Sequence, residues 1–148
     1  MTVKERCEIA KKYREIHMNC NQCILVAFRD ILGLTEAQCW ALGSGFGSGV
    51  RCGGICGAVT APVMVLGAVY PYGPDDGDEA KVRSEAMTKE FERRYAEKFG
   101  HLNCEVLKPR ESAEGTALTR ELGATAVCSV SILTAIEILC DMLGISEG

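Results

Sequence analysis

Three cysteines are placed where the sequence predicts that helices begin. They stand in the segments Asn19-Cys20, Gly54-Ile55-Cys56 and Asn103-Cys104. Asparagine is a favoured N-cap because its side-chain oxygen accepts a hydrogen bond from an otherwise unpaired backbone N–H. The residue after the cap lies at the positive end of the helix dipole, where a thiol ionises more readily. Because the thiolate is the form that attacks disulfides or binds metal, this repeated placement predicts sulfur chemistry.

Two of these cysteines have another cysteine close by. Cys20-Asn-Gln-Cys23 has the spacing of a redox motif and also suits a metal site. The alternative for Cys23 is a core position on the predicted helix. Cys52-Gly-Gly-Ile-Cys56 lies in a glycine-rich segment, and its alternative is a hinge in which both cysteines are small fillers. We favour chemical roles for Cys20 and Cys56.

Glycines on both sides of Cys56 predict close approach of a ligand. Gly54 and Gly57 have no Cβ, so their backbone N–H groups can come near a bound anion or sulfur cluster. We therefore expect both glycines to contribute to cofactor binding, by leaving room for inorganic sulfide and by donating hydrogen bonds.

Two histidines repeat one local pattern. His17-Met-Asn-Cys20 and His101-Leu-Asn-Cys104 share the form His-x-Asn-Cys. A neighbouring imidazolium would lower the pKa of the thiol, and an imidazole is a common metal ligand. Histidine is also frequent in the last turn of a helix, where it interacts with the dipole. The sequence leaves both interpretations open.

The other cysteines fall within helical patterns and are predicted to be small buried hydrophobic residues. On spacing alone, this group contains Cys7, Cys39, Cys128 and Cys140.

Composition excludes several classes of protein. The chain has 148 residues, a formal charge of −4 and scattered basic residues, which argues against a nucleic-acid partner. Its longest uncharged stretches are broken by glycine and proline or are too short for a bilayer, and no signal core precedes them. We expect a soluble cytoplasmic protein without membrane insertion. Its nine cysteines should then be mostly reduced, which favours metal binding or redox chemistry over structural disulfides.

The pattern is helical almost throughout, so the predicted fold is all-α: a single compact helical domain of about five to six helices spanning residues 1–148. A glycine-rich loop lies in the middle. Three helices are predicted to open with the capping boxes Thr2/Glu5, Asn19/Gln22 and Thr35/Gln38, and the second of them ends at Gly33. An apolar helix over residues 58–70 and a charged helix over 78–99 follow. The chain then forms a turn at 103–107, a polar loop at 109–115 and a last helix over about 124–143.

Two features of these helices have alternative interpretations. Either Thr60 caps the apolar helix with Pro62 in its first turn, or that helix begins at Cys56 and kinks at Pro62. Apolar residues at i+4 spacing form a stripe on the charged helix, which is either a dimer face or, more often, part of the core. The stripe consists of Met87, Phe91, Tyr95 and Phe99.

The order of motifs resembles one family. The motifs in chain order are Asn19-Cys20, Cys56-Gly-Ala-Val-Thr-Ala61, Asn103-Cys104 after Phe99-Gly100, and Cys128. This order is similar to that of the C_GCAxxG_C_C proteins. The glycine-rich segment 45–49 is similar too. One departure is Ala61, which replaces the final glycine of the signature, with Pro62 after it.

The resemblance implies a single redox domain in which Cys20, Cys56, Cys104 and Cys128 are the site residues. The family is regarded as redox-active, without a settled reaction, and its members are often encoded near transporter genes. A related domain occurs in split-Soret cytochromes, where an iron–sulfur site has been suspected. The resemblance thus promotes Cys128 from a filler to a site residue.

Three functional hypotheses follow. The first is a redox protein in which Cys20 and Cys56 cycle between dithiol and disulfide, or in which these two with Cys104 and Cys128 hold an iron–sulfur cluster. The second is a structural zinc module without turnover, with Cys20, Cys23, Cys52 and Cys56 as ligands. The third is a helical interaction protein that docks on a redox or transporter-linked partner or forms a homodimer. The sequence does not decide whether the chain is an enzyme.

Overall fold

Six helices of seven or more residues form the frame of the protein in the computed structural model, which describes residues 1–107, 109–110 and 112–147. They are α1 (Val3–Glu15), α2 (Cys20–Ala27), α4 (Glu36–Gly43), α5 (Gly57–Val69), α6 (Asp78–Phe99) and α9 (Val127–Leu143). Shorter helices are α3 (Arg29–Leu32), α7 (Cys104–Leu107) and α8 (Ala117–Glu121), with single turns at Ser44–Phe46 and Gly49–Gly53. The predicted all-α fold in one compact domain is confirmed.

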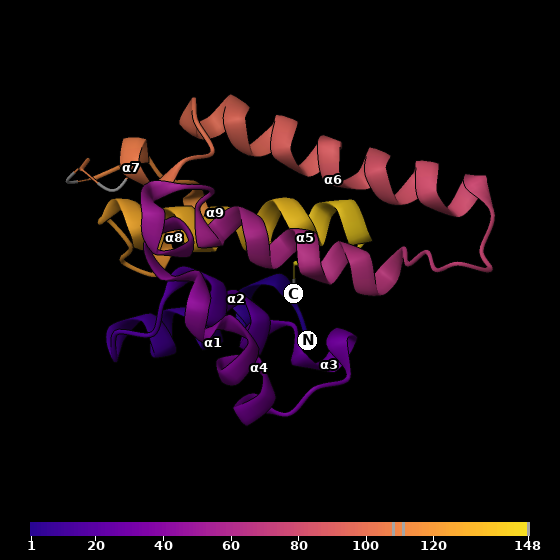
Figure 1. The fold of residues 1–148 in the computed structure, drawn as a ribbon. Helices are drawn as coiled ribbons and strands as arrows, with labels where there is room; N and C mark the ends of the chain where they lie inside the picture. Colours follow the sequence, from indigo (N-terminus) through magenta and orange to yellow (C-terminus); the bar gives the residue numbers. More distant parts are fainter. Residues whose placement is uncertain (108, 111, 148) are drawn as a thin grey trace.

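The helices are stacked in layers with α5 and α9 in the middle (Figure 1). The long helix α6 covers one side of this pair, and α1 and α2 pack on the other. The central position suits α5, which contains no charged residue and can be buried on several sides. Within the described residues, no helix has both the length and the apolar character needed to cross a membrane.

The apolar stripe of α6 belongs to the core. Phe91 and Tyr95 are completely buried and Phe99 nearly so, while Met87 packs against the core from a partly buried position. The rings of Tyr95 and Phe99 also contact each other, with their centroids 4.7 Å apart. The core interpretation of the stripe is therefore confirmed.

The capping signals locate most helix starts. Thr2, Asn19 and Thr35 each form the predicted capping box. Cys56 is the N-cap of α5 and Pro62 lies inside that helix, so the start near Cys56 is the correct alternative.

Some boundaries differ from the expected ones. The helix predicted over residues 19–32 is interrupted at Phe28, which leaves the helical conformation with φ −118° and ψ 20°. The last helix begins at Val127, a few residues after the expected start at about 124. The short helix α8, capped by Thr116, was not predicted. Residue 111 of the predicted loop 109–115 lies outside the described residues.

A buried arginine explains the interruption between α2 and α3. The Arg6 guanidinium donates to the carbonyl of Ala27 at 2.8 Å and to both carboxylate oxygens of Asp30 at 2.7 and 2.9 Å. It also lies 4.6 Å from the ring centroid of Phe28. The carbonyl at the end of α2 is thus paired with a side chain, so the helix can end inside the protein without an unpaired polar group.

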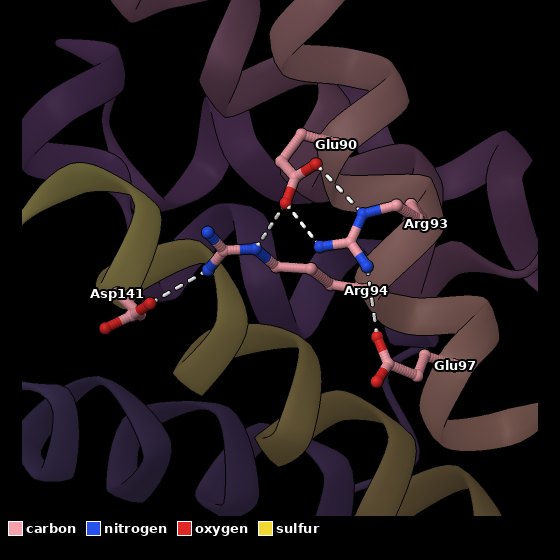
Figure 2. A network of polar contacts seen from close by, with 5 residues as sticks. All are labelled: Glu90, Arg93, Arg94, Glu97 and Asp141. Carbon is pink, nitrogen blue, oxygen red and sulfur yellow. Dashed lines mark hydrogen bonds and ion pairs between the residues drawn. The ribbon is translucent and has the colours of Figure 1, made fainter.

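A network of ion pairs on the surface of α6 reaches α9 through one contact (Figure 2). Glu90 accepts from both Arg93 and Arg94, and these hydrogen bonds lower the pKa of Glu90 to about 2. Arg94 also donates to Asp141 of α9 at 2.8 Å. This contact joins the two helices next to Tyr95, but an exposed pair of this kind contributes little to stability.

We predict that Arg6→Ala lowers the free energy of unfolding by about 2–4 kcal/mol, because it removes three charge-assisted hydrogen bonds and leaves the Ala27 carbonyl buried without its donor. Urea denaturation followed by circular dichroism measures this loss. Arg93→Ala is the control, because Arg93 is exposed, and it should lower stability far less. Equal effects of the two substitutions would contradict the structural role of Arg6.

Candidate redox site

Four cysteines, each at the start of a helix, line one cavity of about 410 Å³. Cys20 is the first residue of α2, Cys56 is the N-cap of α5, Cys104 is the first residue of α7, and Cys128 is the second residue of α9. We call this space the cysteine cavity. The structure therefore brings together all four cysteines that the resemblance marked.

Backbone pairing joins two of the cysteine-bearing segments. An isolated antiparallel bridge connects the chain before α5 to the chain before α7. In it, the Cys56 N–H donates to the carbonyl of Leu102 at 2.8 Å, and the Cys104 N–H donates to the carbonyl of Gly54 at 2.7 Å. Cys56 and Cys104 are thus held on neighbouring chain segments although 48 positions separate them in the sequence numbering.

The start of α5 also packs closely on the start of α2. A Cβ on Gly57 would lie 2.6 Å from the backbone nitrogen of Asn21 and 3.0 Å from the Cβ of Cys20, so only glycine fits there. Gly57 lines the cavity, whereas Gly54 donates its N–H to the carbonyl of Gly49 at 2.9 Å and is not a lining residue. Gly57 therefore sets the separation between Cys20 and Cys56.

Cys56 has the environment of a reactive thiol. Hydrogen bonding to the thiol of Cys20 lowers the pKa of Cys56 to about 7, although burial acts in the opposite direction. The backbone N–H of Ala58, 3.5 Å from the Cys56 sulfur, adds to this lowering, as does the Tyr95 hydroxyl. A substantial fraction of Cys56 is then thiolate near neutral pH.

Cys20 is the proton-bearing neighbour. Hydrogen bonds to Cys128 and Cys56 raise the pKa of Cys20 well above its ordinary value, and burial acts in the same direction. Cys20 thus contacts two other cavity cysteines and stays protonated while Cys56 ionises. A thiolate can attack a disulfide, and a neighbouring thiol can then resolve the mixed disulfide that forms.

Tyr95 approaches Cys56 from α6. Burial, and then the charge of Cys56, raise the pKa of Tyr95, so its hydroxyl keeps its proton. Among the described residues, this buried hydroxyl has no hydrogen-bond partner of normal geometry. The sequence placed Tyr95 only in the core stripe of α6, and its spacing gave no signal of a contact with sulfur.

The remaining cysteines lie in different surroundings. Cys7, Cys39 and Cys140 are completely buried, as predicted, and burial raises the pKa of each. Cys128, grouped with them on spacing alone, instead lines the cavity, so that grouping was wrong.

Neither Cys23 nor Cys52 lines the cysteine cavity. Cys23 is buried and donates to the carbonyl of Met18 at 3.6 Å, and burial raises its pKa to about 12. Cys52 is exposed, with its sulfur 3.4 Å from the carbonyl of Gly49. The buried position of Cys23 is consistent with the alternative in which it is a core residue of α2.

A left-handed turn forms part of the cavity wall. Ser48, Gly49, Val50 and Arg51 have φ values of 52°, 62°, 57° and 60°. For residues other than glycine, this conformation costs about 1–2 kcal/mol each. Gly49 is required because a Cβ there would lie 2.4 Å from the carbonyl oxygen of Gly54. Strained backbone of this kind is concentrated at functional sites, and nothing in the sequence beyond its glycines signalled it.

The histidines differ in their relation to the site. His17 lines the cavity with φ 69°, whereas His101 is not a lining residue. Within residues 1–107, 109–110 and 112–147, no group of three or more His, Cys, Asp or Glu side chains has the arrangement that holds a metal ion.

The fold and the site together define the class of this protein: it is a helical protein whose cysteines meet at helix starts around one cavity. Residues 18–142 match the model of one family, described as "Putative redox-active protein (C_GCAxxG_C_C)". The chain belongs to this family, which confirms the resemblance. No curated protein and no solved structure matches the chain.

We predict that Gly57→Ala lowers the free energy of unfolding by about 1–3 kcal/mol, because the added methyl group overlaps the backbone of α2. It should also slow the alkylation of Cys56 by separating it from Cys20. Gly67→Ala is the matched control in the same helix, since a Cβ there has no atom within 4 Å. Urea denaturation measures the stability of each variant, and iodoacetamide kinetics measure the alkylation of Cys56. Equal stability and equal alkylation rates in the two variants would contradict the packing argument.

Proposed function

We propose that the protein is a dithiol–disulfide redox protein in which Cys56 is the attacking thiolate and Cys20 the resolving thiol. The observation that carries the proposal is that Cys20 and Cys56 line one cavity with their thiols in hydrogen-bonding contact. This contact lowers the pKa of Cys56 and raises that of Cys20. The family description, redox-active, agrees with this role.

The chemistry follows from thiol–disulfide exchange. The Cys56 thiolate attacks one sulfur of a substrate disulfide, forming a mixed disulfide and releasing the first substrate thiolate. Cys20 then loses its proton and attacks the Cys56 sulfur, which releases the second substrate thiolate. Two cysteine sulfurs are oxidised and the substrate disulfide is reduced, so the electrons balance. The N–H of Ala58 and the Tyr95 hydroxyl stabilise the thiolate of Cys56.

The cycle also needs a reductant for the Cys20–Cys56 disulfide. A dithiol-bearing redox partner would supply it by the same exchange reaction in reverse. A reducing compartment such as the cytoplasm would keep both cysteines in the dithiol form between turnovers. A transporter-linked protein is the alternative partner for the same exchange.

We predict that Cys56 is alkylated fastest of the nine cysteines and that its rate rises with pH around a midpoint of about 7. The rate follows the thiolate fraction, which increases as pH rises through the pKa. Limited reaction with iodoacetamide between pH 5 and 10, followed by peptide mass spectrometry, measures the profile. Cys20→Ser should shift the midpoint upward by weakening the hydrogen bond that stabilises the thiolate.

The buried cysteines serve as internal controls. Cys39 and Cys140 are completely buried, so they should react slowly over the whole pH range. Cys23→Ser, which removes a thiol outside the cavity, should leave the Cys56 profile unchanged. A Cys56 rate no higher than that of Cys39 would refute the proposal.

A second candidate is an iron–sulfur centre held by Cys20, Cys56, Cys104 and Cys128. The observation that favours it is the lining of one cavity by four cysteines, the number of thiolates that commonly ligate such a cluster. A bound cluster would supply one-electron transfer. The four cysteines would hold it from four helix starts, and α5 and α7 would be fixed relative to each other by their bridge.

We predict that, if the dithiol function is correct, protein purified without oxygen contains less than one iron per chain and no acid-labile sulfide. Chemical analysis and visible absorption measure this directly. A brown protein with stoichiometric iron and sulfide, both lost in Cys104→Ser, would favour the cluster instead. Stoichiometric zinc that depends on Cys23 would support a structural zinc module.

A further inference from the structure

The side chains of acidic or basic type that line the cysteine cavity are all basic. Arg14, His17 and Arg51 line it, and no Asp or Glu of the described residues does so. This contrasts with the chain as a whole, which has 20 acidic and 16 basic residues. The N-termini of α2, α5 and α9 add partial positive charge to the same space. The cavity is therefore suited to negative charge in a protein that is acidic overall.

The left-handed turn places one of these cations. Arg51 has φ 60°, and its guanidinium donates to the carbonyl of Ser44 at 3.1 Å. Its central carbon lies 3.8 Å from the position that a Cβ on Gly47 would occupy, so the guanidinium lies over a glycine of the cavity wall. The strained backbone thus turns an exposed arginine toward the cavity.

The second arginine comes from the end of α1. Arg14 is half-buried and donates to the carbonyl of Met18 at 2.9 Å, next to the start of α2. Neither Arg14 nor Arg51 forms an ion pair within the part of the chain that the structure describes. Each guanidinium has five N–H donors, so a hydrogen bond to one carbonyl leaves other donors available for a ligand.

We infer that the cysteine cavity selects a small anionic disulfide as its substrate, with Arg14 and Arg51 binding the anionic groups while Cys56 attacks the sulfur. This inference rests on the proposed function and names the substrate class of the same site. A small molecule suits a cavity of about 410 Å³, whereas neutral or cationic disulfides would lack a partner for these charges.

The reaction with such a substrate is balanced. The Cys56 thiolate forms a bond to one sulfur of the anionic disulfide, and the S–S bond of the substrate breaks to release an anionic thiolate. Cys20 loses a proton to solvent and bonds to the Cys56 sulfur, which releases the second anionic thiolate. The arginines neutralise negative charge that would otherwise repel the approaching Cys56 thiolate.

The test compares three disulfide probes of different charge: dianionic 5,5′-dithiobis(2-nitrobenzoate), neutral 4,4′-dithiodipyridine and dicationic cystamine. The rate constant for the reaction of Cys56 with each probe is first divided by the thiolate fraction of Cys56. It is then divided by the rate constant for the reaction of 2-mercaptoethanol thiolate with the same probe. We expect this normalised rate to be about tenfold or more higher for the anionic probe than for the neutral one. It should fall toward equality at 1 M salt, where screening is strong.

Charge-neutralising variants identify the groups responsible. Arg14→Gln and Arg51→Gln should each reduce the anionic preference, and the double variant should abolish it. Arg120→Gln is the matched control: it also removes an exposed arginine that donates to a backbone carbonyl, at 2.6 Å, but Arg120 does not line the cavity. It should retain the preference.

The outcomes separate this inference from the proposed function. Slow reaction of Cys56 with all three probes would refute the dithiol function itself. Fast reaction with equal normalised rates would refute only the anionic substrate. Equal losses in Arg51→Gln and Arg120→Gln would also refute it, because overall charge rather than the cavity would then set the preference.

Discussion

Helix N-termini that point into one space repel each other, because each carries a partial positive charge on unpaired N–H groups. In this protein α2, α5, α7 and α9 begin around a single cavity, each with a cysteine at or beside its first residue. Negative charge on sulfur compensates that field, and the N–H of Ala58 at the start of α5 helps to lower the pKa of Cys56, whereas hydrogen bonds and burial raise the pKa of Cys20. The packing of α5 on α2, the bridge before α7 and the strained turn all serve to hold this arrangement.

The contrast among the cysteines shows that local surroundings, rather than residue type, decide reactivity. Cys23 follows Cys20 by one helical turn, yet burial raises the pKa of Cys23 to about 12, whereas Cys56 has its pKa lowered to about 7. The sulfur of Cys23 meets a carbonyl, which is an acceptor, while that of Cys56 meets the donors of Cys20 and Ala58. A donor stabilises the thiolate and an acceptor stabilises the thiol.

Local signals in the sequence were sufficient for the helix starts that carry a capping box and insufficient for the cavity. Asn19 identified the start of α2 because capping depends on neighbouring residues alone. The interruption at Phe28 depends on Arg6, which is distant in sequence, and the left-handed turn at Arg51 depends on close contact between Gly49 and Gly54. Spacing alone grouped Cys128 with the buried cysteines, and only the family resemblance marked it as a site residue, whereas the structure places it in the lining of the cavity.

The position of Cys20 limits the stoichiometry of oxidation. Its sulfur contacts both Cys56 and Cys128, but a sulfur atom takes part in one disulfide at a time. A disulfide at Cys20 would therefore be one of two mutually exclusive cross-links, between α2 and α5 or between α2 and α9, and its formation would remove two electrons. Each cross-link would tie α2 to a different helix of the central layer, so the choice of partner sulfur would also determine which pair of helices becomes covalently joined.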